Sequence, residues 1–325
     1  MNIKPDRLNK ILSGFTEKNI LVIGDLLLDA YFWGKTERIS PEAPVPIVEV
    51  DRTNYNPGGA GNVALNLVEL GSKVSILSVI GSDMNGDTLL SQLKKAKIDV
   101  SQIIRLNNYQ TPIKTRVIAQ DQQVLRIDQE ENYIDSKLIL SIIEKSLLEN
   151  ITKIDGFVLA DYNKGLLLKD IINIVLNIAD KFSVPVYVDP KWDNFFEYKN
   201  VHFFKPNISE FQKAIGNDYQ ESDFIKHGTQ MREKLNTDIL LVTKGSEEAV
   251  VFTKDGNDSI PTNAQSVHDV SGAGDTVISV FTLADLCGAN AYESANIANI
   301  AASTVCAQVG VVPIKIDDLK SKLLS

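Results

Sequence analysis

One stretch of the chain decides its fold class: residues 62–80 read NVALNLVELGSKVSILSVI. Val63, Leu67 and Leu70 recur at the spacing of one helix face, which predicts a helix that ends at the following glycine. Residues 73–80 are rich in valine and isoleucine, which predicts a short buried strand. A helix that leads directly into an apolar strand is typical of parallel α/β sheets.

The same alternation continues on both sides of this stretch. Four further segments have the apolar, β-branched composition of buried strands: residues 20–24, 156–160, 184–189 and 238–243. Helical periodicity fills other intervals, over residues 87–96, 168–182, 274–286 and 292–308. Alternating strands and helices predict an α/β fold whose central sheet is mainly parallel and covered by helices on both faces. Because no low-complexity linker interrupts the chain, residues 1–325 are expected to form a single domain.

Two segments break this rhythm. Residues 29–52 contain three prolines, too many for a helix, and are extended in character. Residues 103–128 hold two strand-like runs on either side of positions 120–122, which predicts a hairpin. Neither segment fits a strand–helix–strand unit. Both are therefore expected to project from the main sheet as a small β lid, which covers a ligand or provides a surface for homodimerisation.

Composition argues against several functional classes. The 325-residue chain is 44% hydrophobic, enough for a sizeable core, and its formal net charge of −9 opposes nonspecific binding to nucleic acid or to an anionic membrane. Its two cysteines, Cys287 and Cys306, lie in apolar segments and are expected to be buried thiols of a cytoplasmic protein. The three histidines lack partners at metal-ligand spacing, so no zinc site is expected. Residues 276–289 are apolar but too few to span a bilayer.

The strongest chemical signal is a glycine-rich turn that opens an apolar helix, Asp269-Val270-Ser271-Gly272-Ala273-Gly274-Asp275-Thr276. Glycines at a helix start let backbone N–H groups approach a phosphate, and the positive end of the helix dipole favours the anion. A carboxylate there would repel that anion. Asp275 is therefore better suited to act as a base that takes a proton from an attacking hydroxyl. An ordinary glycine-rich turn with an Asp near the helix start is the alternative interpretation.

A second glycine cluster lies in Asn56-Pro57-Gly58-Gly59-Ala60-Gly61-Asn62. It contains the spacing of a dinucleotide-binding fingerprint, but it follows turn residues and not a strand, which makes that interpretation weak. Paired glycines allow a ligand to lie against the backbone, and Asn62 offers both a donor and an acceptor to sugar hydroxyls. A helix-capping turn is the alternative for Asn62.

Polar residues follow four of the predicted strands, at the edge where parallel sheets bind ligands. They are Asp29, Asp161, the Asp189-Pro190-Lys191 run and the Thr243-Lys244-Gly245 run. A further motif, Asn207-Ile208-Ser209-Glu210, is compatible with either a helix-capping box or a water-mediated magnesium site. No Walker A pattern occurs, so phosphoryl transfer would use another architecture.

Taken together, these residues resemble the ribokinase-like (PfkB) family of sugar kinases. Gly58-Gly59 is similar to the family's N-terminal glycine signature, residues 269–275 to its C-terminal D-x-T-G-A-G-D signature, and residues 207–210 to its N-x-x-E magnesium motif. The resemblance covers nearly the whole chain in the correct order. It implies a three-layer α/β/α fold with a projecting lid. It also implies an ATP-dependent sugar kinase that uses Mg²⁺ and, in some members, a monovalent cation such as K⁺.

The resemblance implies a role for each matching residue. Asp275 would be the catalytic base, with an anion hole formed by the backbone of Gly272, Ala273 and Gly274. The sugar would contact Asp29, Gly58, Gly59, Asn62 and, from its place at a strand end, Asp161. ATP would lie against Lys191, Asn207, Ser209, Glu210, Thr243, Gly245 and Asn299, with Asn207 and Glu210 reaching the magnesium ion through water. A monovalent cation would lie near Asp269 and Ser271, where Ser271 replaces the commoner Thr.

Three longer segments are similar to the kinases of this family that act on D-glycero-β-D-manno-heptose 7-phosphate: VIGDLLLDAYFWGKTERISPEAPVPIVEV at residues 22–50, NPGGAGNVALNLVELG at 56–71 and ADYNKG at 160–165. This resemblance implies phosphorylation of the anomeric hydroxyl to give the 1,7-bisphosphate, a precursor of ADP-heptose and the lipopolysaccharide core. The adenylyltransferase of that pathway is expected on a separate polypeptide. The alternatives are a kinase for another sugar or sugar phosphate, and a catalytically silent sugar-binding relative.

A phosphorylated substrate would need a positively charged partner away from its reacting hydroxyl. The chain is acidic overall, yet Lys114, Arg116 and Arg126 cluster in one predicted lid segment, and Arg38 lies in the other. Because side chains alternate along a strand, Lys114 and Arg116 point the same way, at a spacing suited to one phosphate. These four cations are expected to clamp the remote phosphate of the substrate. A solvated, charged strand face is the alternative.

Overall fold

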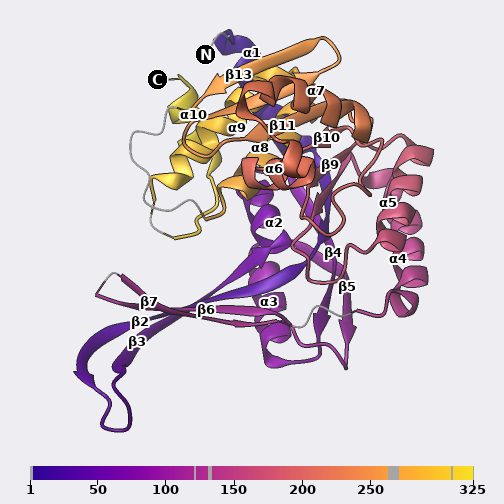
Figure 1. Cartoon of the computed structure of the whole chain (residues 1–325). Helices are drawn as coiled ribbons and strands as arrows, with labels where there is room; N and C mark the ends of the chain where they lie inside the picture. Colours follow the sequence, from indigo (N-terminus) through magenta and orange to yellow (C-terminus); the bar gives the residue numbers. More distant parts are fainter. Residues whose placement is uncertain (1–2, 121, 131–133, 263–270, 309, 325) are drawn as a thin grey trace.

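A single large sheet organises the chain, in a computed structural model that describes residues 3–120, 122–130, 134–262, 271–308 and 310–324. Within these residues its strands are β1 (Asn19–Gly24), β4 (Lys73–Gly81), β5 (Asp99–Leu106), β8 (Gly156–Ala160), β9 (Val186–Asp189), β10 (Phe203–Phe204), β11 (Ile239–Thr243), β12 (Glu248–Thr253) and β13 (Gly256–Pro261). They lie in the order β13-β12-β11-β10-β9-β8-β1-β4-β5 (Figure 1). From β11 to β5 all neighbouring strands are parallel, and only the β11–β12 and β12–β13 pairs are antiparallel. The predicted α/β class with a mainly parallel sheet is confirmed.

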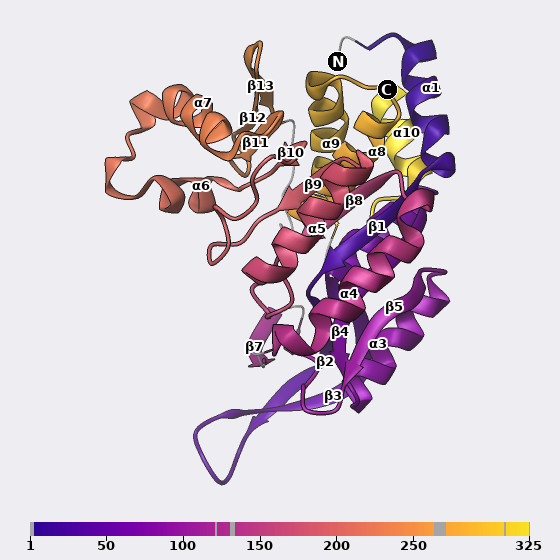
Figure 2. The same ribbon diagram turned by 90° about the vertical axis from the view of Figure 1, so that its right-hand side faces the viewer.

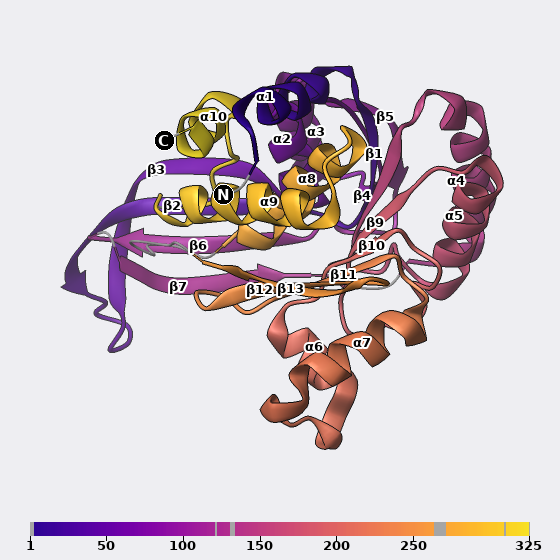
Figure 3. The ribbon, with the colours of Figure 1, turned by 90° about the horizontal axis from the view of Figure 1, so that it is seen from above.

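Helices cover both faces of this sheet, as the continuous apolar runs of its inner strands require (Figure 3). In β1, Ile20 and Val22 pack into one hydrophobic core, whereas Leu21 and Ile23 pack into the other. The first core is closed by α1 (Pro5–Gly14), α2 (Ala60–Glu69), α3 (Met84–Lys95), α8 (Ala273–Leu286), α9 (Ala291–Cys306) and α10 (Ile316–Leu324). The second is closed by α4 (Ser136–Asn150), α5 (Lys169–Phe182), α6 (Ile208–Ile215) and α7 (Phe224–Leu235). The result is a three-layer α/β/α arrangement.

Among the described residues no helix is both long and apolar enough to cross a membrane.

A second, four-stranded sheet projects from this body (Figures 1 and 2). It consists of β2 (Leu26–Ile39), β3 (Pro46–Gly59), β6 (Ile113–Ala119) and β7 (Gln122–Gln129), in the order β3-β2-β6-β7. We call it the lid sheet. β2 begins one residue after β1 ends, and β3 leads directly into α2. The lid sheet is therefore joined to the main sheet and to α2 without intervening loops.

The residues before the second glycine cluster, interpreted from the sequence as a turn, belong to β3, so this cluster does follow a strand. Two further details differ from the sequence-based expectation. Residues 103–106 belong to β5 of the main sheet, so the second lid segment begins later than residue 103. Asp29 does not follow the end of the first strand but lies inside β2, opposite Asn56 of β3 and Lys114 of β6. Both errors have one cause: the apolar runs continue past these points, and pairing with a different sheet leaves no mark on the residue pattern. Position 121, in the predicted hairpin turn, lies outside the described residues.

The lid sheet exposes apolar side chains. Leu125 and Ile127 of β7 are 53% and 51% exposed, and Val45 and Val50 lie in or beside β3 with similar exposure. β7 and β3 are also the edge strands of this sheet, whose outer N–H and C=O groups have no strand partner among the described residues. Exposed apolar edges of this kind favour pairing with another chain.

We expect the protein to form a homodimer through the lid sheet. Replacing both Leu125 and Ile127 with aspartate would place charges in the expected dimer interface. The mass measured by light scattering at micromolar concentration should therefore shift towards that of the monomer. Leu138→Asp is the matched control, because Leu138 is equally apolar and 64% exposed but lies on α4. A wild-type protein that stays monomeric under these conditions would exclude this dimer.

Candidate active site

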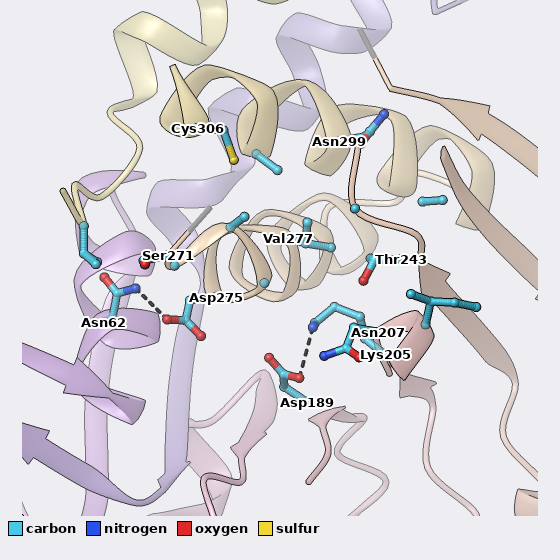
Figure 4. Close-up of a pocket in the computed structure, with 18 of the residues that line it drawn as sticks. Asn62, Asp189, Lys205, Asn207, Thr243, Ser271, Asp275, Val277, Asn299 and Cys306 are labelled. Carbon is cyan, nitrogen blue, oxygen red and sulfur yellow. Dashed lines mark hydrogen bonds and ion pairs between the residues drawn. The ribbon is translucent and has the colours of Figure 1, made fainter. Parts of the chain in front are cut away.

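A cavity of about 700 Å³ lies at the carboxyl ends of the parallel strands, beside the lid sheet (Figure 4). Its wall includes most residues predicted for the site: Asp29, Gly59, Asn62, Lys114, Arg116, Lys191, Asn207, Ser209, Thr243, Gly245, Ser271, Gly272, Ala273, Gly274, Asp275 and Asn299. These residues come from both sheets, from the starts of α2, α6 and α8, and from α9. The fold thus collects residues that are up to 270 positions apart around one space, as expected for a site at the ends of parallel strands.

The helix α8 points its N-terminus into this cavity. Gly272 precedes the helix with φ +83°, a left-handed conformation, and a Cβ there would lie 2.9 Å from the Asn62 amide nitrogen. The first helical hydrogen bond inside α8 is from Thr276 N–H to the Gly272 carbonyl, at 3.0 Å. The N–H groups of Ala273, Gly274 and Asp275 therefore have no helical acceptor, which is the arrangement that binds anions at helix starts.

The Asp275 carboxylate is buried, and two donors hold it. Asn62 Nδ2 donates to one oxygen at 2.6 Å (Figure 4), and the Tyr162 hydroxyl donates to the other. Burial and the negative charge of Asp189 raise the pKa of Asp275 to about 6, against the lowering effect of the two hydrogen bonds. The group is therefore ionised at neutral pH but close enough to titration to accept a proton.

Tyr162 and Asp25 were not predicted as site residues. Asp25 is buried in the single-residue junction between β1 and β2. Its carboxylate accepts backbone N–H groups from Tyr162 (2.9 Å), Lys164 (3.1 Å) and Leu166 (3.0 Å). It therefore fixes the loop that follows β8, and through that loop the hydroxyl that contacts Asp275. The ADYNKG segment of the sequence contains this loop, but its pattern does not reveal the hydrogen-bond partners.

A buried ion pair lies beside the start of α8. Lys205 Nζ is 3.0 Å from Asp189 Oδ1, and their side chains are 3% and 8% exposed (Figure 4). A Cβ on Gly274 would meet Lys205 Nζ at 3.4 Å, so the ammonium group lies next to the helix N-terminus. Sequence reasoning missed Lys205 because it follows β10, which has only two residues and gives no detectable strand pattern.

Asn207 and Glu210 form the predicted capping box at the start of α6. The Asn207 side chain accepts the Glu210 N–H at 2.9 Å, and Glu210 Oε2 accepts the Asn207 N–H at 2.9 Å. Glu210 Oε1 accepts a hydrogen bond from Lys191 Nζ. Each carboxylate oxygen keeps a free lone pair after these bonds, so the pair fits a hydrated Mg²⁺ reached through water. Within the described residues, no three His, Cys, Asp or Glu side chains are grouped to bind a metal directly.

The lid contributes a charged wall to the cavity. Arg116 Nη1 is 2.5 Å from Asp29 Oδ1, with side chains that are 17% and 10% exposed. Gly58 lies in β3, next to this pair. A Cβ at that position would overlap the Asp29 carboxylate. Gly58 therefore acts by leaving room for Asp29, while its neighbour Gly59 lines the cavity itself.

The structure does not bring every predicted residue to the cavity. Asp161 is 1% exposed and accepts hydrogen bonds from the Tyr198 hydroxyl (2.7 Å) and the Asn163 N–H (2.9 Å). Its carboxylate is thus part of a buried hydrogen-bond network and does not line the cavity. Arg38 and Arg126 are paired with Glu49 and Asp128 on the lid and are not part of the cavity wall. Asp269 lies outside the described residues.

Removal of the Asp25 carboxylate should destabilise the whole protein. Asp25→Ala leaves three N–H groups without their acceptor, one of them buried and two part-buried, and a buried group without a partner costs about 1–3 kcal/mol. We expect the free energy of unfolding measured in urea to fall by roughly 2–4 kcal/mol. Asp155→Ala is the control, because Asp155 accepts one backbone N–H, from Asn19, at a more exposed position. Equal losses in the two variants would contradict the central role of Asp25.

Both the sequence and the fold match known proteins. The bifunctional protein HldE of Sulfurimonas denitrificans is 40% identical over 312 residues, which are 96% of this chain and 65% of that protein. HldE of Aliarcobacter butzleri is 41% identical over 307 residues, 93% of this chain and 63% of that protein. The chain thus spans about 65% of the length of the relatives it matches. Among solved structures, phosphofructokinase-2 from Escherichia coli in complex with potassium superposes with a TM-score of 0.79 at 19% identity, over 94% of this chain and 98% of that one.

The family comparison agrees with the site geometry. The description "pfkB family carbohydrate kinase" matches residues 17–317, nearly the whole chain. The matched region contains both sheets, the start of α8 and every residue that lines the cavity. This chain belongs to the pfkB family of ATP-dependent carbohydrate kinases.

Proposed function

We propose that this kinase transfers the γ-phosphoryl group of ATP to the anomeric hydroxyl of a heptose 7-phosphate, with Asp275 as the base. One observation carries the proposal: a buried carboxylate with a pKa of about 6 lies at a helix N-terminus, in a cavity that also contains the lid cations Lys114 and Arg116. The first feature suits phosphoryl transfer to a hydroxyl. The second suits a sugar that already carries a phosphate.

The reaction follows from the positions of these groups. Asp275 accepts the proton of the sugar hydroxyl as that oxygen forms a bond to the γ-phosphorus. The bond between that phosphorus and the oxygen bridging to the β-phosphate breaks, and ADP leaves with the electron pair. The free N–H groups of Ala273 and Gly274 and the ammonium group of Lys205 face the charge that develops on the transferred group.

The other end of the cavity suits the nucleotide. Thr243 of β11 and Asn299 of α9 line it there (Figure 4), and Gly245, two residues after β11, also lines the cavity. Asn207 and Glu210 would hold a hydrated Mg²⁺ beside the phosphates, where the metal neutralises phosphate charge. A ribokinase of the same fold from Arabidopsis thaliana has been solved in complex with ribose and ATP, so a fold of this kind can hold a sugar and a nucleotide together. A monovalent cation near Ser271, an adenylyltransferase on a separate chain and a cytoplasmic location remain predictions.

Replacing the base should abolish turnover without loss of the fold. Asp275→Asn keeps the size of the side chain but removes the proton acceptor, and general-base catalysis contributes about 10²–10⁴-fold. In wild type, kcat should fall as the pH drops through about 6, because protonated Asp275 cannot accept a second proton. A coupled assay of ADP release with heptose 7-phosphate, fructose 6-phosphate and ribose measures both effects. Residual activity above about a tenth of wild type would exclude this role for Asp275.

Arg116 should determine the affinity for the phosphorylated sugar. Its guanidinium group lines the cavity and can bind phosphate through two N–H groups. Arg116→Ala should raise the KM for the sugar phosphate about ten- to hundredfold and leave the KM for ATP nearly unchanged. Arg126→Ala serves as the control, because Arg126 lies opposite Arg116 in the lid sheet but outside the cavity wall. Similar small effects from both variants would support a neutral sugar as the substrate.

A further inference from the structure

Lys114 lines the cavity, and Glu130 connects it to Lys164, a lysine that lies outside the lid and is not itself part of the cavity wall. Lys164 lies in the loop after β8, and its side chain is 13% exposed. The Glu130 carboxylate lies between the two lysines: its Oε2 is 2.5 Å from Lys164 Nζ, and its Oε1 is 3.8 Å from Lys114 Nζ. One carboxylate thus presents one oxygen to each ammonium group. Two oxygens of a phosphate group could contact the same two ammonium groups.

The lid places like charges close together, which is costly unless an anion lies among them. Arg116 and Arg126 are directly opposite in the antiparallel pair of β6 and β7, and like charges in that position destabilise a sheet. Lys114 is repelled by both Lys164 and Arg126, and its partial burial lowers its pKa. The described carboxylates that neutralise this group are Asp29, Asp128 and Glu130.

Glu130 differs from the other two carboxylates in its backbone. Asp29 and Asp128 lie within β2 and β7, where ladder pairing holds them. Glu130 follows the end of β7 and belongs to no strand or helix. Its backbone can therefore shift together with the side chain, away from the lysines, without the loss of a strand hydrogen bond. Lys164, in contrast, is fixed, because its N–H is bonded to the buried Asp25.

From this arrangement we infer that Glu130 occupies the subsite of the substrate's remote phosphate in the empty enzyme, and that Lys164 binds this phosphate together with Lys114. The inference rests on the proposed function and adds a phosphate-binding residue from outside the lid. A phosphate monoester carries about −1.5 to −2 charges and three acceptor oxygens, so it can displace a carboxylate that carries one charge. Because Lys164 shares its loop with Tyr162, which contacts Asp275, the phosphate would be held at a fixed separation from the base.

The two residues should have opposite effects on substrate affinity. Glu130→Gln removes the competing charge at nearly constant size, and should lower the KM for the sugar phosphate several-fold. Lys164→Ala removes a phosphate ligand, and should raise that KM about ten- to hundredfold. The KM for ATP should stay within about twofold in both variants. If Glu130 is instead a brace that positions Lys164, both variants will raise the KM for the sugar phosphate, and the inference is wrong.

A binding measurement separates this inference from the proposed catalytic function. Isothermal titration calorimetry with inorganic phosphate, in the absence of ATP, should give tighter binding to Glu130→Gln than to wild type and weaker binding to Lys164→Ala. Glu197→Gln is the matched control, because Glu197 pairs with Lys169 at 3.2 Å on a different surface and should leave phosphate binding unchanged. Glu130→Ala should act in the same direction as Glu130→Gln and replaces it if the latter fails to fold.

The outcomes remain distinguishable. If no sugar phosphate is turned over but inorganic phosphate binds as described, the phosphate subsite is supported and the proposed substrate is excluded. If sugar phosphates are turned over but phosphate binding does not respond to Glu130 or Lys164, the substrate stands and this subsite is excluded.

Discussion

The structure depends on one buried carboxylate. Asp25 occupies the single residue between β1 of the main sheet and β2 of the lid sheet. Its side chain accepts three N–H groups of the loop after β8, and its backbone carbonyl accepts the Ala60 N–H at the start of α2 (3.0 Å). A buried carboxyl group is costly unless such donors compensate for the lost water. Satisfying Asp25 therefore requires both sheets, α2 and this loop to meet in one arrangement.

That arrangement also links Asp275 to the charged region of the lid. The loop held by Asp25 brings Tyr162 to Asp275 and Lys164 to Glu130. In the proposed reaction, neighbouring residues of this one loop would support both proton transfer and recognition of the remote phosphate. If the substrate is a sugar phosphate, its reacting hydroxyl and its phosphate would have to match this separation, and the enzyme would discriminate between sugars by their length.

Charge balance is a second property of the cavity. Buried or half-buried cations are paired with carboxylates of the chain: Lys205 with Asp189, Arg116 with Asp29, and Lys191 with Glu210. Such pairs hold positive groups in a desolvated space in the absence of an anion. An incoming phosphate can then exchange with a carboxylate and need not meet an unpaired, hydrated ammonium group. The acidic net charge of the chain is therefore compatible with anionic substrates.

The sequence by itself determined those features whose signal is local. Three features have such a local signal: the alternation of strands and helices, the capping box at Asn207 and Glu210, and the glycine turn before Asp275. Each depends on residues that lie within a few positions of one another, and the structure contains all three. Only the tertiary structure decided that Asp161 is buried, that Lys205 faces the cavity and that Tyr162 contacts Asp275, 113 positions away. The physical reason is that backbone geometry fixes local patterns through neighbouring residues, whereas the partner of a polar side chain depends on how distant segments pack.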